Sequence, residues 1–279
     1  MSDLNLSITE QLAYSTVRII CTKKDGRPSS GTGYFYDFGY LSDVENANMP
    51  VIVTNKHVIR NGAKVEFVVN LQENGKPTNK LFHVTLTNIE QQWFMHPKEE
   101  IDLCIFPIAP LVMRMQEQNK KPFFISIGND FIPSQDEIDE LTAMEDIVMV
   151  GYPNGIWDSV NNQPVFRKGI TATHPAKDYN GKPEFMIDAA CFPGSSGSPV
   201  FLMNLGGYQT RKGHILGQSR VKLLGTLYAG PQYNAKGEIK VETIPTENIP
   251  VSLTAIPNNL GNVIKARALK GFESILKQK

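Results

Sequence analysis

The sequence predicts an all-β protein made of closed barrels or sandwiches. Glycine and proline supply 22 and 18 of its 279 residues, a content that suits many turns between short strands. Short runs rich in β-branched and aromatic residues recur along the chain, and turn-forming clusters separate them. Helical patterns do not alternate with these runs, which argues against a parallel β/α sheet and favours folds that close their strand edges.

The first half of the chain begins with a short helix. Ser7 and Glu10 have the spacing of a capping box, so we expect a helix that starts behind Ser7 and ends near Ala13. Alternating and β-branched patterns then predict about six strands. These strands are expected at residues 16–21, 33–36, 50–54, 64–69, 81–87 and 102–106.

A change of composition follows the sixth strand. Prolines and a polar run between residues 108 and 122 indicate a connection between two units. About six more strands are expected at 147–150, 165–171, 185–189, 199–203, 223–229 and 239–244. Behind Asn258 and Asn259, apolar residues return at roughly helical spacing, together with several basic residues. We therefore expect a C-terminal helix whose cations form a solvated face rather than a polyanion-binding patch.

Charge and composition exclude several classes of protein. Lysine plus arginine and aspartate plus glutamate each number 28, so the chain lacks the positive excess of a nucleic-acid binder. No apolar run has the length of a membrane span, and the N-terminus lacks a signal-peptide pattern. The three cysteines, Cys21, Cys104 and Cys191, are widely spaced, which predicts free thiols and a cytoplasmic location. Cysteines and histidines lack metal-ligand spacing, so we expect no metal and no cofactor.

The segment 191–200 is the most informative one for chemistry. Gly194 and Gly197 flank Ser195 and Ser196 in a tight turn, and glycine permits backbone dihedrals that other residues avoid. Such a turn can expose a hydroxyl and direct successive N–H groups at one point, as the stabilisation of an oxyanion requires. A simple glycine–serine turn between two strands explains the same pattern.

Two further residues could activate a serine hydroxyl, which is a weak nucleophile without a base. His57 follows the apolar strand 50–54, so its imidazole would stand at the end of a rigid element. Asp102 precedes four apolar residues. A partly buried carboxylate needs partners, and a histidine needs an acceptor that fixes its tautomer. Taken singly, a structural histidine and a turn-forming aspartate explain these positions equally well.

Together, three segments resemble the motifs of trypsin-like (chymotrypsin-fold) serine proteases. They are Thr54-Asn55-Lys56-His57-Val58, Ile101-Asp102-Leu103-Cys104 and Gly194-Ser195-Ser196-Gly197-Ser198-Pro199. The chain order histidine, aspartate, serine also fits this family. Segments 31–34 and 186–190 are similar to the bacterial branch that contains the HtrA/DegP and V8-like (glutamyl endopeptidase) groups. The resemblance extends over about residues 14–250, so no PDZ domain is expected.

The resemblance implies two six-stranded antiparallel barrels with the active site between them. The units would be a first barrel at 1–112, a connection at 113–122, a second barrel at 123–257 and the helix at 258–279. His57 would act as general base and then acid, Asp102 would orient it, and Ser196 would be the nucleophile. The backbone N–H groups of Gly194 and Ser196 would form the oxyanion hole.

The departures from the family pattern concern activation and specificity. Ser195 replaces the aspartate that digestive members place before the nucleophile, so we expect no activation by N-terminal cleavage. Ala190 stands where trypsin has an acid. The other residues expected in the pocket wall are Cys191, Tyr228, Ala229 and Gly230. An uncharged pocket predicts cleavage after an apolar or small side chain, and we assign the Cys191 thiol to this wall rather than to catalysis.

The expected activity is the hydrolysis of peptide bonds. A serine endopeptidase of this kind would act on a peptide or protein substrate through an acyl-enzyme, without a cofactor. Two alternatives remain open: a protease-fold module that binds peptides with little turnover, and an esterase that uses the same mechanism. No nucleic-acid or membrane partner is expected. A regulatory protein partner, or an ordering transition of residues 191–197, would restrain a cytoplasmic protease that lacks a pro-segment.

Overall fold

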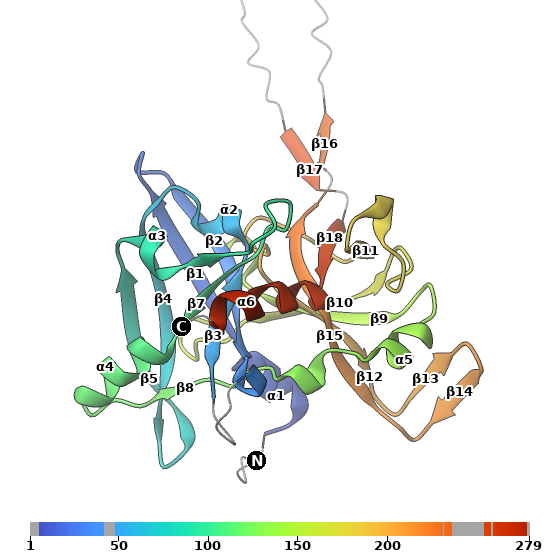
Figure 1. Ribbon diagram of the computed structural model, residues 1–279, viewed down its shortest axis with the longest axis horizontal. Coiled ribbons are helices and arrows are strands. Elements are labelled where there is room, and N and C mark those ends of the chain that lie inside the picture. The colour runs from blue at the N-terminus through green and yellow to red at the C-terminus, as the bar shows by residue number, and fades with distance from the viewer. Residues whose placement is uncertain (1–5, 42–47, 231, 236–253, 258, 278–279) are drawn as a thin grey trace, which may run out of the picture.

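The chain folds into two β units that lie side by side, the first coloured blue to green and the second yellow to red (Figure 1). The computed structural model describes residues 6–41, 48–230, 232–235, 254–257 and 259–277. Strands dominate both units, and the helices are short. The predicted all-β class is therefore confirmed, and the arrangement is that of a chymotrypsin-like fold.

The first unit is an antiparallel sheet of eight strands with the order β5-β4-β1-β2-β3-β7-β6, and β8 pairs with β4. The strands are β1 Thr16–Lys23, β2 Pro28–Asp37, β3 Pro50–Thr54, β4 Gly62–Glu73, β5 Lys76–Leu86, β6 Phe94–Met95, β7 Cys104–Pro107 and β8 Pro122–Phe123. Within the described residues no ladder joins β5 to β6, so hydrogen bonds do not close this sheet as a six-stranded barrel would require. β6 and β8 hold two residues each, too few for a sequence pattern to reveal.

The second unit is a closed antiparallel barrel with the strand order β10-β11-β18-β15-β12-β9. Its strands are β9 Asp146–Gly151, β10 Val165–Thr171, β11 Glu184–Asp188, β12 Pro199–Asn204, β15 Arg220–Ala229 and β18 Leu260–Lys265. Two hairpins extend from it, β13 Gly207–Thr210 with β14 Gly213–Leu216 and β16 Gln232–Ala235 with β17 Thr254–Pro257. The strand expected at 239–244 lies outside the described residues. Closure by six strands confirms the architecture expected for this unit.

The prediction of a helix over residues 258–279 was wrong for its first part. Leu260–Lys265 forms β18, which pairs with β11 on one side and β15 on the other and so closes the barrel. Apolar Leu260, Val263 and Ile264 fit both a helical and a strand pattern over so few residues. The two neighbouring strands decide the outcome, since each offers an unpaired edge. Helical structure begins only at Ala266–Phe272 and continues in α6.

The remaining helices connect or flank the two units. They are α1 Ile8–Ala13, α2 Lys56–Ile59, α3 Ile89–Gln92, α4 Ala109–Glu117, α5 Gln135–Asp139 and α6 Glu273–Leu276, with 3-10 turns at Gly39–Leu41, Asn129–Phe131, Pro153–Gly155, Tyr179–Gly181 and Ala266–Phe272. The predicted capping box of α1 is confirmed, because Ser7 Oγ accepts the Glu10 N–H and Glu10 accepts the Ser7 N–H. Helix α4 occupies the start of the expected connection.

The alternation of side chains along the strands builds three apolar cores. One face of the first sheet fills its own core, and the inward face of the barrel fills a second. The remaining faces meet in a third core between the units, which also receives the C-terminal segment. Phe201 in β12 and Tyr34 in β2 belong to this shared core. Their chain neighbours Val200, Leu202 and Phe35 instead face the cores of their own units. Because successive strand residues point to opposite faces, one strand can serve both its own unit and the seam.

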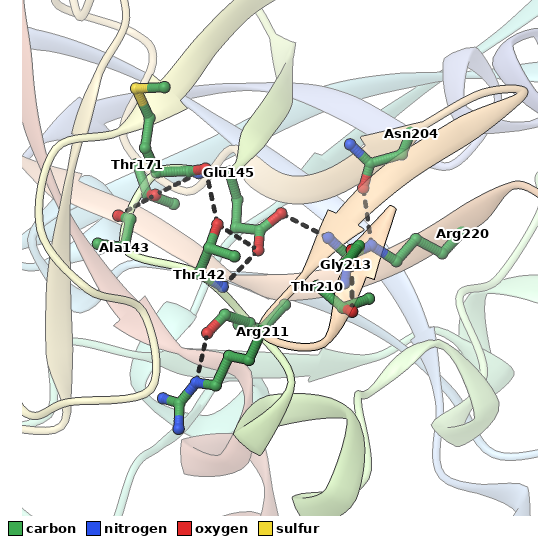
Figure 2. A network of polar contacts seen from close by, with 11 residues as sticks. Thr142, Ala143, Glu145, Thr171, Asn204, Thr210, Arg211, Gly213 and Arg220 are labelled. Carbon is green, nitrogen blue, oxygen red and sulfur yellow. Dashed lines mark hydrogen bonds and ion pairs between the residues drawn. The ribbon is translucent and has the colours of Figure 1, made fainter. Parts of the chain in front are cut away.

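A buried ion pair stabilises the barrel away from this seam (Figure 2). Arg220 in β15 donates to Glu145, and their side chains are 13% and 4% exposed. Asn204 accepts the Arg220 Nε–H, and Thr142 donates to Glu145 through its N–H and its hydroxyl. The Arg220 guanidinium also lies over the ring of Tyr208 in the β13–β14 hairpin. The network thus ties β15, β12 and this hairpin together.

Candidate active site

His57 lies in the short helix α2, which follows the buried strand β3 in the chain. Lys23 holds the far end of this helix, since its Nζ donates to the carbonyls of His57, Val58 and Arg60. Val58, a residue of this helix, is fully buried. The imidazole therefore projects from a turn that is fixed at both ends, as the sequence predicted for a residue at the end of a rigid strand.

Asp102 accepts two hydrogen bonds from His57. The His57 backbone N–H donates to Oδ1 at 3.1 Å, and Nδ1 lies 2.5 Å from Oδ2. Asn55 donates to the Asp102 carbonyl at 2.7 Å and fixes the backbone as well. A carboxylate is an acceptor only, so Nδ1 carries its proton toward Asp102 and Nε2 is left as the acceptor. The two side chains are 45% and 23% exposed, which leaves the imidazole accessible to substrate.

The serine segment forms a type II turn over Phe192–Ser195. The Ser195 N–H donates to the Phe192 carbonyl at 3.0 Å, and Gly194 has a φ of +88°. Proline at the second position and glycine at the third are the residues that this turn requires. A Cβ at Gly194 would also lie 2.5 Å from the Tyr152 carbonyl oxygen, so no other residue fits without a shift.

This turn leaves two N–H groups without an acceptor. The N–H groups of Ser195, Gly197 and Ser198 are all bonded to backbone carbonyls, whereas those of Gly194 and Ser196 have no acceptor among the described residues. The Pro193 carbonyl accepts the Asn154 N–H at 2.5 Å. The Pro193 C=O and the Gly194 N–H belong to one trans peptide and point in opposite directions, so this bond directs the Gly194 N–H away from Asn154. N–H groups free of protein acceptors are one precondition of an oxyanion hole.

The serine segment packs against the strands that lead to His57. The Thr32 N–H donates to the Ser196 carbonyl at 2.8 Å, and Thr54 Oγ1 donates to the Thr32 carbonyl at 2.7 Å. A Cβ at Gly31 would meet both the Val58 side chain and the Ser196 carbonyl. Ser196 and α2 thus share one contact surface on β2. Within the described residues no hydrogen bond joins the Ser196 hydroxyl to His57; such bonds often tighten only when substrate binds.

Three of the predicted pocket residues come together beside this segment. A Cβ at Gly230 would lie 3.8 Å from Cβ of Cys191, and one at Gly261 would lie 2.6 Å from Sγ of Cys191. Arg167 in β10 donates to the Ala190 carbonyl. Burial raises the pKa of the Cys191 thiol to about 11, so it stays neutral at physiological pH. Cys191, Gly230 and Gly261 therefore lie close together, with Ala190 next to Cys191 in the chain; their role as a substrate pocket stays a prediction.

The Tyr228 hydroxyl, also predicted for the pocket, bonds to a side chain of strand β11. It donates to the buried carboxylate of Glu184 in β11 at 2.9 Å. Ala229 ends β15 next to it. Sequence reasoning also missed Arg167, whose guanidinium lies 4.8 Å from the Phe192 ring centroid and brings a cation close to Ala190. Only the pairing of distant strands places this residue, so no local signal could have found it.

No group of three or more histidine, cysteine, aspartate or glutamate side chains is arranged to hold a metal ion in the part of the chain that the structure describes. None of the helices described there is long and apolar enough to cross a membrane.

The fold and the site define a class of serine-type peptidase. A family model described as a trypsin-like peptidase domain matches residues 31–206, which include His57, Asp102 and Ser196. The match covers well over half of the chain, and the chain belongs to the trypsin-like peptidase family. This membership confirms the resemblance drawn from the three motifs. No curated protein gives a significant match to the sequence.

Solved structures of proteases, one of them an HtrA-type protease, are among those similar to this chain. The HtrA-type protease AlgW, solved with a tripeptide, is 15% identical with a TM-score of 0.52; the match covers 96% of this chain and 62% of AlgW. A serine endoprotease from Yersinia pestis is 14% identical with a TM-score of 0.49, over 96% of this chain and 65% of that one. The Rv3671c protease from M. tuberculosis, in its active form, is 13% identical with a TM-score of 0.46, over 96% and 83%. At these identities the likeness to AlgW supports a shared fold and nothing finer.

Proposed function

We propose that the protein is a serine endopeptidase that cleaves peptide bonds through an acyl-enzyme. The observation that carries this proposal is the pairing of two features at one place. His57 is bonded to Asp102 through both its ring and its backbone N–H. Next to it, the turn around Ser196 leaves the N–H groups of Gly194 and Ser196 without acceptors.

In the proposed mechanism, the Ser196 hydroxyl attacks the substrate carbonyl while His57 Nε2 takes its proton. Asp102 holds the imidazole in the tautomer that accepts at Nε2 and stabilises the imidazolium that forms. The N–H groups of Gly194 and Ser196 bind the developing oxyanion. His57 then returns the proton to the leaving amine, and a water molecule hydrolyses the acyl-enzyme by the same steps in reverse order.

The pocket supports a preference for an apolar or small residue before the cleaved bond. Ala190 provides no charge, and the raised pKa keeps the Cys191 thiol neutral. The guanidinium of Arg167, bonded to the Ala190 carbonyl, would repel a lysine or arginine side chain. A peptide library should therefore show little cleavage after basic residues. Cleavage mainly after lysine or arginine would contradict this preference.

A fluorophosphonate probe tests the proposed chemistry without knowledge of the substrate, because it reacts only with an activated serine. The wild-type protein should be labelled at Ser196, and Ser196→Ala should lose all labelling while it keeps its melting temperature. Ser195→Ala is the matched control, since it changes the neighbouring hydroxyl and should still be labelled. A wild-type protein that resists labelling, or is labelled elsewhere, would overturn the proposal.

The alternative of a peptide-binding module with little turnover keeps one observation in its favour. The Ser196 hydroxyl makes no hydrogen bond to His57 within the described residues. On this alternative, wild-type and Ser196→Ala would bind peptides equally while neither reacted with the probe. Esterase activity alone would show as labelling and ester hydrolysis without cleavage of any peptide.

The proposed location is the cytoplasm, and the proposed control is by a protein partner. Free thiols at Cys21, Cys104 and Cys191 support a reducing compartment. Fractionation of cells that express the tagged protein tests the location, and its recovery from an oxidising compartment with blocked thiols would contradict it. A partner that acts on residues 191–197 should raise the labelling rate of Ser196 when added.

A further inference from the structure

Lys56, the residue before His57, is a buried lysine that the mechanism above does not use. It is only 6% exposed. Its Nζ donates to the carbonyls of Lys98 at 3.0 Å and Glu99 at 3.2 Å. No carboxylate lies within ion-pair distance of it among the residues that the structure describes. A buried ammonium without a direct counter-ion is costly, so its retention calls for a reason.

The two carbonyls belong to the loop that leads into Asp102. Three consecutive residues of the His57 segment hold this loop. Asn55 donates to the Asp102 carbonyl, Lys56 to the carbonyls of residues 98 and 99, and His57 to the Asp102 carboxylate. Lys56 grips the loop upstream of Asp102, where residues 97–100 are exposed to solvent. Lys98 is also bonded to His96 and Ile101, but without Lys56 the loop would be bonded to the His57 segment at Asp102 alone.

The charge of Lys56, like its hydrogen bonds, favours a loop position that keeps Asp102 nearby. The charged and titratable groups that face it are Asp102, Glu99, Cys104, Arg60 and His96. Burial lowers the pKa of Lys56, and the negative charge of Asp102 opposes this shift. Cys104 is neutral, because burial raises its pKa well above the ordinary value. Asp102 and the Lys56 ammonium therefore stabilise each other across a distance longer than a direct ion pair.

We propose that Lys56 is a positioning residue whose buried ammonium holds the 98–102 loop, and with it Asp102, in line with His57. Its role is to keep the Nδ1–Asp102 hydrogen bond formed in the free enzyme. The consequence for catalysis rests on the proposed function, but the hydrogen bond itself does not. Lys56 acts only through Asp102 and touches neither substrate nor the reacting hydroxyl.

The hydrogen bond can be observed without any activity. A histidine Nδ1 proton bonded to a carboxylate gives a far-downfield NMR signal, and Asp102→Asn identifies it by its loss. The signal should be present in wild-type and in Ser196→Ala, and should be lost or broadened in Lys56→Met, which keeps the length and apolar packing of the side chain. Lys56→Arg should restore it. Lys98→Met is the matched control, because it removes a neighbouring exposed charge but keeps the backbone carbonyl that Lys56 contacts.

The labelling rate gives the second readout. Lys56→Met should be labelled about tenfold more slowly or worse, the scale of one lost charge-assisted hydrogen bond, and Lys98→Met within about twofold of wild-type. Because burial lowers the pKa of Lys56, raising the pH removes its charge at a lower pH than for an ordinary lysine. Wild-type labelling should then fall at alkaline pH, whereas Lys56→Arg, which stays charged, should retain it. A role in stability alone would not separate wild-type from Lys56→Arg in this way.

Each outcome decides between the two proposals. If Lys56→Met keeps both the NMR signal and the wild-type rate, Lys56 has no positioning role, and the proposed function is untouched. If the wild-type is not labelled but the signal depends on Lys56 as described, the proposed function fails and the positioning role stands. If Lys56→Met does not fold, the alkaline comparison decides: a parallel loss in wild-type and Lys56→Arg would overturn the positioning role.

Discussion

Two clusters of charge, one in each unit, differ in how completely their hydrogen bonds are used. In the barrel, Glu145 and Arg220 are nearly buried, and side chains or backbone groups of their neighbours partner both the carboxylate and the guanidinium (Figure 2). At the seam, His57 and Asp102 are bonded to each other but remain partly exposed. Beside them, two N–H groups of the Ser196 turn have no acceptor within the described residues.

The difference separates a cluster that stabilises the fold from one that can act on a ligand. A buried network tolerates no unpaired member, because each unpaired polar group costs free energy in a low dielectric. A catalytic site needs the opposite, with donors already oriented toward a charge that exists only in the transition state. Mutations should therefore affect stability in the Glu145–Arg220 cluster and rate in the His57–Asp102 cluster.

The largest effect on rate is expected from Asp102→Asn. The amide would donate to His57 Nδ1 and force the proton onto Nε2, the tautomer that cannot accept from Ser196, so peptide hydrolysis should fall about 10⁴-fold. The melting temperature should change little. Asp136→Asn, in the exposed helix α5, is the control and should leave both quantities unchanged. A residual rate within tenfold of wild-type would show that the His57–Asp102 cluster is not catalytic.

The largest effect on stability is expected from Arg220→Met. It leaves the Glu145 carboxylate buried without its partner, which should lower the free energy of unfolding by about 3–5 kcal/mol. The labelling rate per folded molecule should stay the same. Combining it with Glu145→Leu removes both charges and should recover much of the loss. Denaturant unfolding measures both variants, and equal losses in the single and double variants would contradict the argument.

Gly194→Ala should slow the reaction without a matching loss of stability. Its φ of +88° and the contact with the Tyr152 carbonyl would force the turn to move, and with it one oxyanion donor. We expect a fall in labelling rate of about 10²–10³-fold, as for the loss of one such donor. Gly181→Ala is the matched control: it also has a positive φ but meets no atom within 4 Å. That variant should cost about 1 kcal/mol of stability and no rate.

The smallest effect is expected for a charge pair outside both clusters. Lys212 Nζ lies 2.6 Å from Glu140 Oε1, but the Lys212 side chain is mostly exposed. Lys212→Ala should change the free energy of unfolding by less than about 0.5 kcal/mol and leave labelling unaffected. A loss comparable to that of Arg220→Met would show that burial does not explain the difference between the two ion pairs.

The candidate triad residues could be named from motifs and chain order alone, because each motif is a short run of consecutive residues. The type II turn at Pro193 and Gly194 and the capping box at Ser7 are local as well, since a few residues determine each. The surroundings of the proposed pocket were harder to predict. Ala190, Cys191 and Gly230 were named from the sequence, whereas Arg167 and Gly261 were not, because strand pairing alone brings them to that region.

The C-terminal segment and Lys56 show why the remainder could not be predicted. Leu260–Lys265 is a strand because β11 and β15 offer it partners on both sides, and nothing in the segment itself reveals them. Nothing in the sequence around Lys56 distinguishes it from an ordinary surface lysine. Only the loop before Asp102, folded over it, buries its ammonium.

By itself, the sequence determined the strand-rich class, the alternation of side chains along the strands, the serine turn and three candidate catalytic residues. These depend on dihedral preferences and on side-chain periodicity, which act over a few residues. The tertiary structure alone decided the contact between His57 and Asp102, the burial of Lys56 and the two N–H groups left without acceptors. Such contacts join residues far apart in the chain, and they exist only once distant strands have paired, as β3 and β7 do to bring His57 to Asp102.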